Sequence, residues 1–406
     1  MEAALPPRRT CRGFRAEYVM KKFVDLDVRG KTVVIRQDLN VPMKNGTITN
    51  DKRIRAALPT VKMALEKGAG VILISHLGRP VEGEYAEEFS LKPVAEHLGK
   101  ALGMTVSVAK DLASCHVKPG QCQLLENIRF FKGEKKNDPA LAKQLADLGD
   151  VYVMDAFGTA HRAQASTEGA VRQAKIACAG PLMVNEVEAF GRVLNDPKRP
   201  LAAIIGGAKV STKLGVLNNL LEKVDILIVG GGIANTFLAA MGYSVGTSLY
   251  EPDLIEEAKK IMQKAKDKGC QLPLPVDVVT AKELAQGQKG TEVDVAHVPA
   301  DAMILDIGSQ TEALYAKVLK EAQTVVWNGP MGAFETEPFH KGTVALARDL
   351  ANSQAFVVVG GGDSVACVEK YDLADKMGYI STGGGASLEL LEGKQLPAIA
   401  ALEDRS

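Results

Sequence analysis

The stretch VVVGGGDSVA, from Val357 to Ala366, contains the pattern that sets the fold class of this chain. Three β-branched residues run directly into three glycines, and Asp363 and Ser364 follow. A run that is apolar at every position is typical of a strand buried on both faces, as in a parallel sheet. Glycines between a strand and a helix let backbone N–H groups approach a ligand closely. The stretch therefore predicts a strand, a turn that binds an anion, and a helix.

Similar apolar runs alternate with segments of helical spacing from Met20 onward. Two of these segments, Asp138–Gly149 and Glu251–Gly269, have the acidic start and the glycine stop of a helix. This alternation predicts the α/β class with doubly wound, Rossmann-like parallel sheets. The apolar runs are Thr32–Arg36, Gly70–His76, Gln123–Asn127, Val151–Phe157, Leu201–Gly207, Asp225–Gly232, Thr324–Pro330 and Ala355–Gly362.

The length of 406 residues favours two or three domains. After a turn signal at Cys178–Pro181, the residues Met183, Val187, Phe190 and Leu194 form one apolar stripe of a helix. We therefore expect two doubly wound domains of similar size joined by a hinge helix. The predicted ranges are 1–19 for a disordered or spurious extension, 20–180 for the first domain, 181–195 for the helix, 196–387 for the second domain and 388–406 for a tail.

Composition excludes several classes of protein. Lys+Arg and Asp+Glu are both 49, so the chain lacks the basic excess of a non-specific nucleic-acid binder. No apolar run approaches the roughly 20 residues that span a bilayer. The six cysteines lack the spacing of metal ligands, which favours reduced thiols in a cytosolic protein. The first 19 residues hold four arginines but no apolar core of a secretory signal, and an Arg-rich targeting peptide is the alternative to a disordered extension.

Three further glycine-rich turns follow apolar runs in the second half of the chain, in Ile204–Lys213, Ile228–Phe237 and Ile380–Glu389. The N–H groups of such a turn and the dipole of the helix after it favour phosphate. A single turn is explained equally well by close packing, but four in one domain favour phosphate binding. Among the four, Ile228–Phe237 is the best candidate for a purely structural role.

Two lysines and a carboxylate add nucleotide chemistry to these turns. Lys209 and Lys213 are four residues apart, so both would lie on one face of a helix after the turn. Asp363 and Ser364 are hard oxygen ligands suited to Mg²⁺, although a helix cap is the simpler role for the aspartate. No G-x-G-x-x-G is present, and Gly30–Thr32 resembles a P-loop but leads into a strand. We therefore predict that the turn receives a metal-bound polyphosphate.

The apolar runs of the first half end in charged side chains instead of glycines. Because the carboxyl ends of parallel strands line one crevice, these side chains should converge. Guanidinium groups suit phosphate and carboxylate, although each arginine alone would pass as a surface residue. We expect a small, multiply anionic ligand, with Asp38 and Asn40 on its hydroxyl groups. The predicted basic pocket contains Arg53, His76, Arg79, Arg129, His161 and Arg162, with Arg36 beside it.

A polyphosphate in one domain and a second anion in the other predict phosphoryl transfer by an enzyme that closes on its substrates. A nicotinamide-dependent dehydrogenase is the rival enzyme, and the missing G-x-G-x-x-G disfavours it. A non-catalytic nucleotide sensor or scaffold is the rival from another class. It is disfavoured because both Arg53 and Lys213 are present, one in each domain.

In these details the sequence resembles the phosphoglycerate kinase family, and its bacterial members in particular. The resemblance implies reversible transfer of the acyl phosphate of 1,3-bisphosphoglycerate to Mg-ADP, giving 3-phosphoglycerate and ATP. It implies phosphoglycerate in the first domain, nucleotide in the second, and a tail that returns to the first. It also implies a cytoplasmic monomer without nucleic-acid or membrane partners. The matching motifs, in family order, are RQDLNVP, SHLGRP, ENIRF, DAFGTAHR, GGAKVSTK, WNGPMGAFE, GGGDS and STGGGASLELLEGK.

The resemblance also implies roles for the residues that match these motifs. Arg53 and Lys213 would contact the transferring phosphoryl group, flanked by turn glycines that include Gly362, Gly384 and Gly385. Asp363 would hold Mg²⁺ together with the nucleotide phosphates, and Glu335 would bind the ribose. The residues implied for phosphoglycerate are Asp38, Leu39, Asn40, Arg53, His76, Leu77, Gly78, Arg79, Arg129 and Arg162. Those implied for the nucleotide are Gly207, Lys209, Lys213, Asn328, Glu335, Gly361, Gly362, Asp363 and Ser364.

Three features depart from the family pattern. Gln37 stands where a small apolar residue is expected, and Ser364 replaces the usual threonine but keeps its hydroxyl. Residues 1–19 have no counterpart. None of these departures removes a catalytic group, so the expectation of activity stands.

Overall fold

A computed structural model describes residues 18–406, and most of the predicted N-terminal extension therefore lies outside the described residues. The described chain divides into two compact units. The N-terminal unit consists of Tyr18–Glu188 together with Gln395–Ser406, and the C-terminal unit consists of Ala189–Lys394. The residue limits that we predicted for the domains, and the hinge function of the helix between them, stay predictions.

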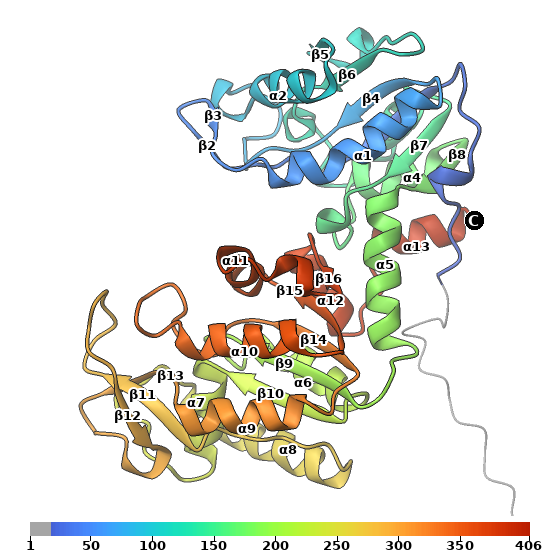
Figure 1. The fold of residues 1–406 in the computed structure, drawn as a ribbon. Coiled ribbons are helices and arrows are strands. Elements are labelled where there is room, and N and C mark those ends of the chain that lie inside the picture. Colours follow the sequence, from blue (N-terminus) through green and yellow to red (C-terminus); the bar gives the residue numbers. More distant parts are fainter. Residues whose placement is uncertain (1–17) are drawn as a thin grey trace, which may run out of the picture. The chain divides into compact units, whose positions relative to one another are not determined.

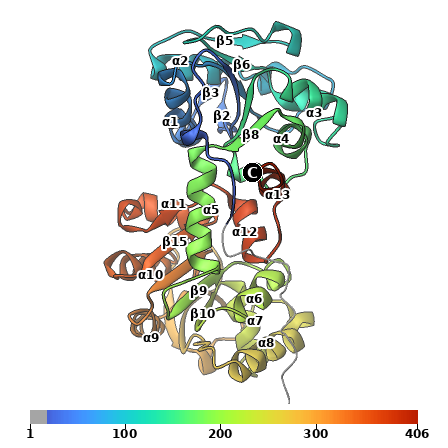
Figure 2. The ribbon, with the colours of Figure 1, turned by 90° about the vertical axis from the view of Figure 1, so that its right-hand side faces the viewer.

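The N-terminal unit is built on a six-stranded parallel sheet in the order β5-β6-β4-β1-β7-β8 (Figure 1). Helices α1 and α2 cover one face, and α3 and α4 cover the other, where α13 packs on α4 (Figure 2). The strands are β1 (Thr32–Arg36), β4 (Gly70–Ile74), β5 (Val106–Ala109), β6 (Cys122–Leu125), β7 (Val151–Met154) and β8 (Ile176–Ala179). The helices are α1 (Lys52–Glu66), α2 (Lys92–Leu102), α3 (Pro139–Ala146), α4 (Ala170–Gln173) and α13 (Pro397–Asp404).

The C-terminal unit is built on a five-stranded parallel sheet in the order β10-β9-β14-β15-β16. Helices α9, α10 and α11 pack on one face of this sheet, and α6, α7, α8 and α12 lie on the other (Figure 2). The strands are β9 (Leu201–Gly206), β10 (Ile226–Gly230), β14 (Thr324–Asn328), β15 (Phe356–Gly360) and β16 (Tyr379–Ile380). The helices are α6 (Leu214–Leu221), α7 (Gly232–Ala240), α8 (Ile255–Asp267), α9 (Ser309–Leu319), α10 (Lys341–Asn352), α11 (Gly362–Lys370) and α12 (Gly384–Leu391).

The predicted α/β class with doubly wound parallel sheets is confirmed. Seven of the eight apolar runs contain one strand of a parallel sheet, and the run Gln123–Asn127 overlaps β6, which begins one residue earlier. In β1, the side chains of Val33, Val34 and Ile35 are completely buried, as expected for a strand with helices on both faces. The chain leaves β1 toward β4 on one side and later adds β7 on the other. In open parallel sheets, ligands generally bind at the carboxyl ends of the strands where such a change of direction occurs.

Helix α5 (Pro181–Leu194) carries the predicted apolar stripe. Its four members are at most 5% exposed, which confirms the stripe. The boundary between the two units falls inside this helix, between Glu188 and Ala189. At the start of the helix, the Oδ1 atom of Asp155 accepts a hydrogen bond from the N–H of Leu182 at 2.9 Å. Asp155 follows β7, so it ties the helix start to the carboxyl edge of the N-terminal sheet.

Several short elements were not predicted from the sequence. They include the antiparallel sheet β12-β11-β13, the hairpin β2-β3, and the edge strands β5 and β8 of the N-terminal sheet. The elements not yet given have the bounds β2 (Met43–Lys44), β3 (Thr47–Ile48), β11 (Asp277–Ala281), β12 (Thr291–Asp294) and β13 (Met303–Ile307). Short helical turns are η1 (Phe23–Asp25), η2 (Glu87–Phe89), η3 (Leu112–Ser114), η4 (Ile128–Phe130), η5 (Phe157–Thr159), η6 (Ala165–Gly169), η7 (Pro252–Leu254), η8 (Val295–His297) and η9 (Ala374–Lys376).

Two negative expectations can be compared with the described residues. The five described cysteines are all free and buried. Burial raises the pKa of these thiols, for example to about 12 at Cys122 and Cys367, which keeps them protonated and unreactive. Among residues 18–406, no helix has both the length and the apolar character that crossing a membrane requires.

Candidate active site

Strand order explains why the predicted basic pocket of the N-terminal unit comes together. Strands β6, β4, β1 and β7 are neighbours in the sheet, and their carboxyl ends lie at one edge. Asp38 and Asn40 follow β1, and His76 follows β4. Arg129 follows β6, and Arg162 follows β7 through the short helix η5. The structure therefore brings these predicted residues to one edge of the sheet.

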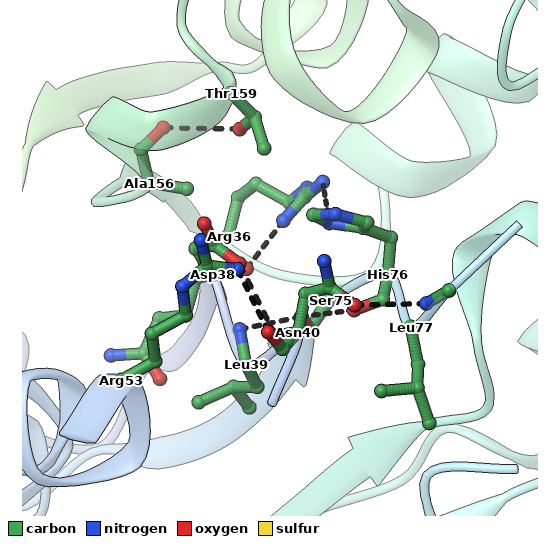
Figure 3. Close-up of polar contacts among 12 residues, drawn as sticks. Arg36, Asp38, Leu39, Asn40, Arg53, Ser75, His76, Leu77, Ala156 and Thr159 are labelled. Carbon is green, nitrogen blue, oxygen red and sulfur yellow. Dashed lines mark hydrogen bonds and ion pairs between the residues drawn. The ribbon is translucent and has the colours of Figure 1, made fainter. Parts of the chain in front are cut away.

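The loop after β1 is ordered by its own polar groups (Figure 3). The Oδ1 atom of Asp38 accepts hydrogen bonds from the Asn40 N–H at 3.2 Å and from Nη1 of Arg53 at 3.3 Å. Arg53, which lies on α1, also donates to the Asn40 carbonyl at 2.8 Å. The Oδ1 atom of Asn40 accepts from the Gly78 N–H at 2.9 Å and so joins this loop to the loop after β4. These bonds hold the partly exposed guanidinium of Arg53 at the rim of the pocket.

Arg36 and His76 form the buried back of the pocket (Figure 3). The Nε of Arg36 donates to the Oγ of Ser166 at 2.8 Å, and its Nη2 lies 3.4 Å from Nδ1 of His76. Burial lowers the pKa of His76 well below its usual value, and the positive charges of Arg36 and Arg129 lower it further. His76 is therefore neutral at neutral pH. The positive charge of the pocket comes from its arginines.

Arg129 is a buried cation whose hydrogen-bond donors are not all paired within the described residues. It is 7% exposed, and its Nη1 donates to the Gly78 carbonyl. Its Nε is buried and has no hydrogen-bond partner among the described residues. Burial lowers the pKa of Arg129 to about 10, and repulsion from Arg162, Arg36 and Arg79 contributes, yet the group stays charged at neutral pH. A buried guanidinium with a spare donor, surrounded by like charges, indicates an anionic ligand.

Leu39 and Leu77 can contact a ligand only through their backbones, because both side chains are buried in the core. The Leu39 N–H donates to Oγ of Ser75 at 2.9 Å, and the Leu77 N–H donates to Oδ1 of Asn127 at 3.1 Å. Asn127 also donates to the Leu77 carbonyl at 2.7 Å, which fixes the loop that carries His76 and Gly78. These two leucines thus shape the pocket from behind.

The C-terminal unit contains a cavity of about 330 Å³ at the carboxyl ends of β9, β10 and β14. This is the place where the C-terminal sheet changes winding direction, between β9 and β14. The walls are mainly apolar, and the glycine turns after β9 and β10 contribute to them. The residues that line the cavity include Gly207, Gly231, Gly232, Leu249, Met303, Leu305, Asp306, Gly332, Ala333 and Asp363.

The glycine turn after β10 has two functions. A Cβ atom on Gly231 would lie 2.7 Å from the Gly207 carbonyl oxygen, and one on Gly232 would lie 2.1 Å from that of Ala208. Close packing therefore requires both glycines, as the sequence interpretation proposed. The same two residues also line the cavity, so their role is not purely structural.

Lys213 and Asn328 form a polar pair in the C-terminal unit. The Nζ of Lys213 donates to Oδ1 of Asn328 at 2.9 Å. Burial lowers the pKa of Lys213, while the carboxylates of Glu392 and Asp363 act in the opposite direction. Asn328 is 2% exposed, and its Nδ2 has no hydrogen-bond partner among the described residues. The pair therefore offers a cation and a spare donor beside the turn at Gly361, whose Cβ position lies 3.1 Å from that Nδ2.

The prediction that Lys209 and Lys213 share a helix face is wrong. Helix α6 begins only at Leu214, and Lys213 is the residue before it. The segment between the lysines forms turns, in which the Thr212 hydroxyl donates to the Lys209 carbonyl at 2.8 Å and Ser211 bonds to Glu251. The Thr212 bond is a local side-chain bond of the kind that competes with a helix. Lys209 is exposed, whereas Lys213 is partly buried.

Helices α11 and α12 begin at glycines that protein packing does not require. A Cβ atom on Gly362 or on Gly384 would meet no atom within 4 Å, and neither residue has a positive φ. Their N–H groups belong to first turns, which lack partners within the helix. Open space above such N–H groups is what an approaching phosphate needs. Gly385 is the second residue of α12.

Two predicted nucleotide residues lie differently from what their motifs suggest. The Oγ of Ser364 is buried and accepts a hydrogen bond from the Gly329 N–H at 2.7 Å, so its hydroxyl joins two turns of the protein. Glu335 is exposed and is not among the residues that line the cavity. Its carbonyl accepts from Nε2 of Gln286 at 3.0 Å.

A model of the phosphoglycerate kinase family matches residues 23–394. The chain belongs to the phosphoglycerate kinase family. It is 69% identical to the phosphoglycerate kinase of Desulfovibrio desulfuricans over 385 residues, which cover 95% of this chain and 99% of that protein. It is 55% identical to the phosphoglycerate kinase of Legionella pneumophila over 386 residues, covering 95% and 98% of the two chains.

Solved structures of phosphoglycerate kinases agree with this relation. The structure of the Coxiella burnetii enzyme is similar with a TM-score of 0.92 at 54% identity. That of the Pyrococcus horikoshii enzyme is similar with a TM-score of 0.82 at 33% identity. In both cases the match covers 95% of this chain and all of the solved chain.

For this phosphoglycerate kinase family member, the donor set fits a magnesium ion that arrives with a nucleotide. Among residues 18–406, no group of three or more His, Cys, Asp or Glu side chains is placed to hold a metal ion. Asp363 is exposed at the start of α11 and lines the cavity. Mg²⁺ usually keeps one or two protein carboxylates and takes its other ligands from phosphates and water. A single carboxylate beside a phosphate turn meets that requirement.

Sequence reasoning missed the apolar lining of the cavity and the groups behind the basic pocket. The buried carboxylate of Glu134 accepts from the Ser166 N–H at 2.9 Å, and its charge favours the cationic form of Arg36. The run MILDI, which forms β13 and supplies Met303 and Leu305, is short, and no glycine turn marks it. Gln37 is completely buried, and its Nε2 donates to the Ala57 carbonyl at 2.9 Å, away from the pocket.

Proposed function

We propose that this chain carries out the reaction of its family, the reversible transfer of the acyl phosphate of 1,3-bisphosphoglycerate to Mg-ADP, which gives 3-phosphoglycerate and ATP. The observation that carries the proposal is a buried side-chain donor in each unit that has no hydrogen-bond partner among residues 18–406. These donors are Nε of Arg129 in the N-terminal unit and Nδ2 of Asn328 in the C-terminal unit. Such groups are costly unless a ligand satisfies them.

Phosphoglycerate is proposed to bind at the basic pocket. Arg129 and the neighbouring arginines would bind its phosphate and carboxylate, and neutral His76 would offer a hydrogen bond without adding charge. Asp38 and Asn40 would hold its hydroxyl group. The proposed substrate residues are Asp38, Leu39, Asn40, Arg53, His76, Leu77, Gly78, Arg79, Arg129 and Arg162.

The nucleotide is proposed to bind at the cavity, with the base between its apolar walls. The phosphates would lie over the N–H groups of Gly362 and Asp363 at the start of α11, where the helix dipole favours negative charge. Lys213 would then donate to phosphate as well as to Asn328. The proposed nucleotide residues are Gly207, Lys209, Lys213, Asn328, Glu335, Gly361, Gly362, Asp363 and Ser364.

Asp363 is proposed to bind Mg²⁺ together with the nucleotide phosphates. The bound ion would supply positive charge to the phosphate oxygens. The chain itself would hold the phosphates through backbone N–H groups, Lys213 and Asn328. The Ser364 hydroxyl would serve the turn by holding Gly329, because its oxygen is already bonded there.

In the direction of ATP use, a carboxylate oxygen of 3-phosphoglycerate would attack the γ-phosphorus. The new carboxyl–phosphate bond would form as the bond to the ADP oxygen breaks, so no protein nucleophile is needed. Arg53 and Lys213 would neutralise charge on the transferring group, and the turns at Gly362 and Gly385 would flank it. Transfer would take place directly, in line, when the units approach each other with both ligands bound.

Separate titration of the two ligands tests this assignment. Arg79→Ala should weaken 3-phosphoglycerate binding and leave the affinity for Mg-ADP nearly unchanged, because Arg79 belongs to the basic pocket. Arg55→Ala, which removes an exposed arginine that lies on α1 and pairs with Asp51, is the matched control and should change neither affinity. A coupled assay of ATP formation measures turnover. Equal loss of both affinities in Arg79→Ala, or no turnover by the wild type, would contradict the proposal.

From the family relation, we also propose that the protein acts as a cytoplasmic monomer on small molecules, without nucleic-acid or membrane partners. The balance of 49 basic and 49 acidic residues supports the absence of nucleic-acid binding. Light scattering coupled to size-exclusion chromatography should give the mass of one chain, 43.2 kDa. A dimer mass would contradict this part of the proposal.

A further inference from the structure

Asp306, in strand β13, is a buried carboxylate in the wall of the cavity. It is 2% exposed and belongs to the lining residues. Its Oδ2 accepts a hydrogen bond from the Gly342 N–H at 2.8 Å, in the first turn of α10. Its Oδ1 accepts from the N–H of Ile307 at 2.9 Å. The carboxylate therefore fixes the start of α10 to the end of β13.

The segment after β14 packs against the same carboxylate. A Cβ atom on Gly332 would lie 2.5 Å from Oδ1 of Asp306, so this glycine permits direct packing. The neighbouring Ala333 N–H donates to the Leu305 carbonyl at 2.7 Å. Leu305, Gly332 and Ala333 all line the cavity. Three segments, two of which supply lining residues, thus meet at one charged group.

We propose that Asp306 is a positioning residue for the nucleotide, which holds these segments so that the cavity fits the base. This inference rests on the proposed function, because it takes the cavity as the nucleotide site. Asp306 touches no reacting atom in that arrangement. Its loss should therefore raise the KM for nucleotide and leave kcat nearly unchanged at saturation.

The environment of Asp306 adds a pH dependence to this role. Burial raises the pKa of Asp306 to about 7, and the charge of Glu312 on α9 raises it as well. Lys341 on α10 and the two backbone N–H bonds act in the opposite direction. When the carboxylate gains a proton, one of its oxygens becomes a poor acceptor, and the tie to α10 or to Ile307 weakens. Nucleotide affinity should consequently fall as the pH falls through about 7.

The test compares the KM for Mg-ATP, at saturating 3-phosphoglycerate, in the wild type and in Asp306→Asn between about pH 6 and pH 8. The wild-type KM should rise up to about tenfold toward pH 6, because one proton controls the site. The KM of Asp306→Asn should be high and nearly independent of pH. Titration of the nucleotide phosphates affects both proteins equally, so the difference between the curves isolates Asp306.

Asp277→Asn is the matched control. Asp277 is also a buried carboxylate that follows a helix-capping pattern, since it accepts from the N–H groups of Gln310 and Thr311 at 2.9 and 2.7 Å at the start of α9. It is not among the lining residues of the cavity. This variant should lose stability but keep the wild-type KM profile. A wild-type KM that is flat between pH 6 and pH 8 overturns the inference whatever the variants do.

Ala333→Phe separates failure of the inference from failure of the proposed function. The larger side chain would fill the cavity, so binding of ADP, measured by calorimetry, should be lost. Wild-type binding by Ala333→Phe would place the nucleotide elsewhere and contradict the proposed function. Loss of binding in Ala333→Phe, combined with a wild-type profile in Asp306→Asn, would overturn only the role of Asp306.

Discussion

Two single residues, His76 and Asn328, have charge states and hydrogen bonds that suit the charged ligands proposed for the two units. In the basic pocket, His76 is kept neutral by burial and by the arginines around it, so it does not add to their mutual repulsion. In the C-terminal unit, Oδ1 of Asn328 accepts a hydrogen bond from Lys213, and its Nδ2 has no hydrogen-bond partner in the described part of the chain. In both places, groups that cost folding free energy are arranged where an anion would compensate them.

Lys213→Ala should lower kcat by about 10²–10³ and change nucleotide binding much less. The reason is that the ammonium group is proposed to stabilise charge that develops during transfer, while the N–H groups of the turns hold the phosphates in the ground state. Steady-state kinetics, together with calorimetric titration of ADP, measures the two effects. Lys259→Ala, on the exposed surface of α8, is the control and should behave like the wild type. Turnover near the wild-type level in Lys213→Ala would remove this residue from the mechanism.

His76 should make the N-terminal unit sensitive to acid. Its pKa in the folded protein is lowered below the value of about 6.5 in an unfolded chain, so below that pH the unfolded chain binds a proton that the folded chain does not. The contribution of His76 to the free energy of unfolding is present above about pH 6.5 and is lost as the pH falls below that value. The free energy of unfolding, measured in urea, should therefore fall more steeply between pH 7 and pH 5 for the wild type than for His76→Gln. Parallel curves for the two proteins would show that His76 is not the titrating group.

At the scale of elements, the glycine turns separate into two kinds that look alike in the sequence. Gly329 has φ +104°, and a Cβ atom there would lie 2.2 Å from the Gly206 carbonyl oxygen. Gly362 has open space around its Cβ position. The first kind is required by the fold. The second kind is not required by packing of the protein around it.

Gly362→Ala and Gly329→Ala should therefore have opposite effects. Gly362→Ala should keep or slightly increase stability, because alanine is favoured over glycine in a helix, and should weaken nucleotide binding by blocking the N–H groups. Gly329→Ala should cost more than about 2 kcal/mol of unfolding free energy through strain and overlap. Urea unfolding monitored by Trp327, the single tryptophan, and titration with ADP measure the two properties. Unchanged ADP affinity in Gly362→Ala would contradict the proposed phosphate site.

Long buried elements could be predicted from the sequence, whereas local exceptions could not. The run VVVGGG covers β15 except for its first residue and reaches the start of α11, because both the burial of the strand and the freedom of the turn are visible in residue types. The predicted helix between Lys209 and Lys213 is absent because Thr212 bonds locally to the Lys209 carbonyl and Ser211 bonds to the distant Glu251. Strand β12 was not predicted because its residues are largely exposed. The role of Asp306 depends on contacts with α10 and with Gly332, which are distant in the sequence.

At the scale of the whole molecule, the N-terminal unit is made of two separate stretches of chain. Its second stretch contains α13, in which Ile399 and Leu402 are almost completely buried. The N–H of Ala398 donates to the Ala160 carbonyl at 3.1 Å, two residues before Arg162. The end of the chain therefore supports the segment that carries one arginine of the basic pocket.

Removal of residues 395–406 should destabilise the N-terminal unit by about 3 kcal/mol or more, because two large apolar side chains lose their burial. It should also weaken 3-phosphoglycerate binding and leave ADP binding intact, because the cavity lies wholly in the other unit. Arg172→Ala is the control, since it removes only the partly exposed pairs of Arg172 with Asp404 and Glu168, each of which contributes about 1 kcal/mol or less. Loss of ADP affinity in the shortened protein would contradict this expectation.

The divided N-terminal unit has a consequence for the protein during its synthesis. A ribosome translates Tyr18–Glu188 first, but the stretch that completes this unit emerges only after all of Ala189–Lys394 has been made. The unit that is begun first is thus finished last. A nascent chain can accordingly complete its C-terminal unit while its N-terminal unit still lacks helix α13.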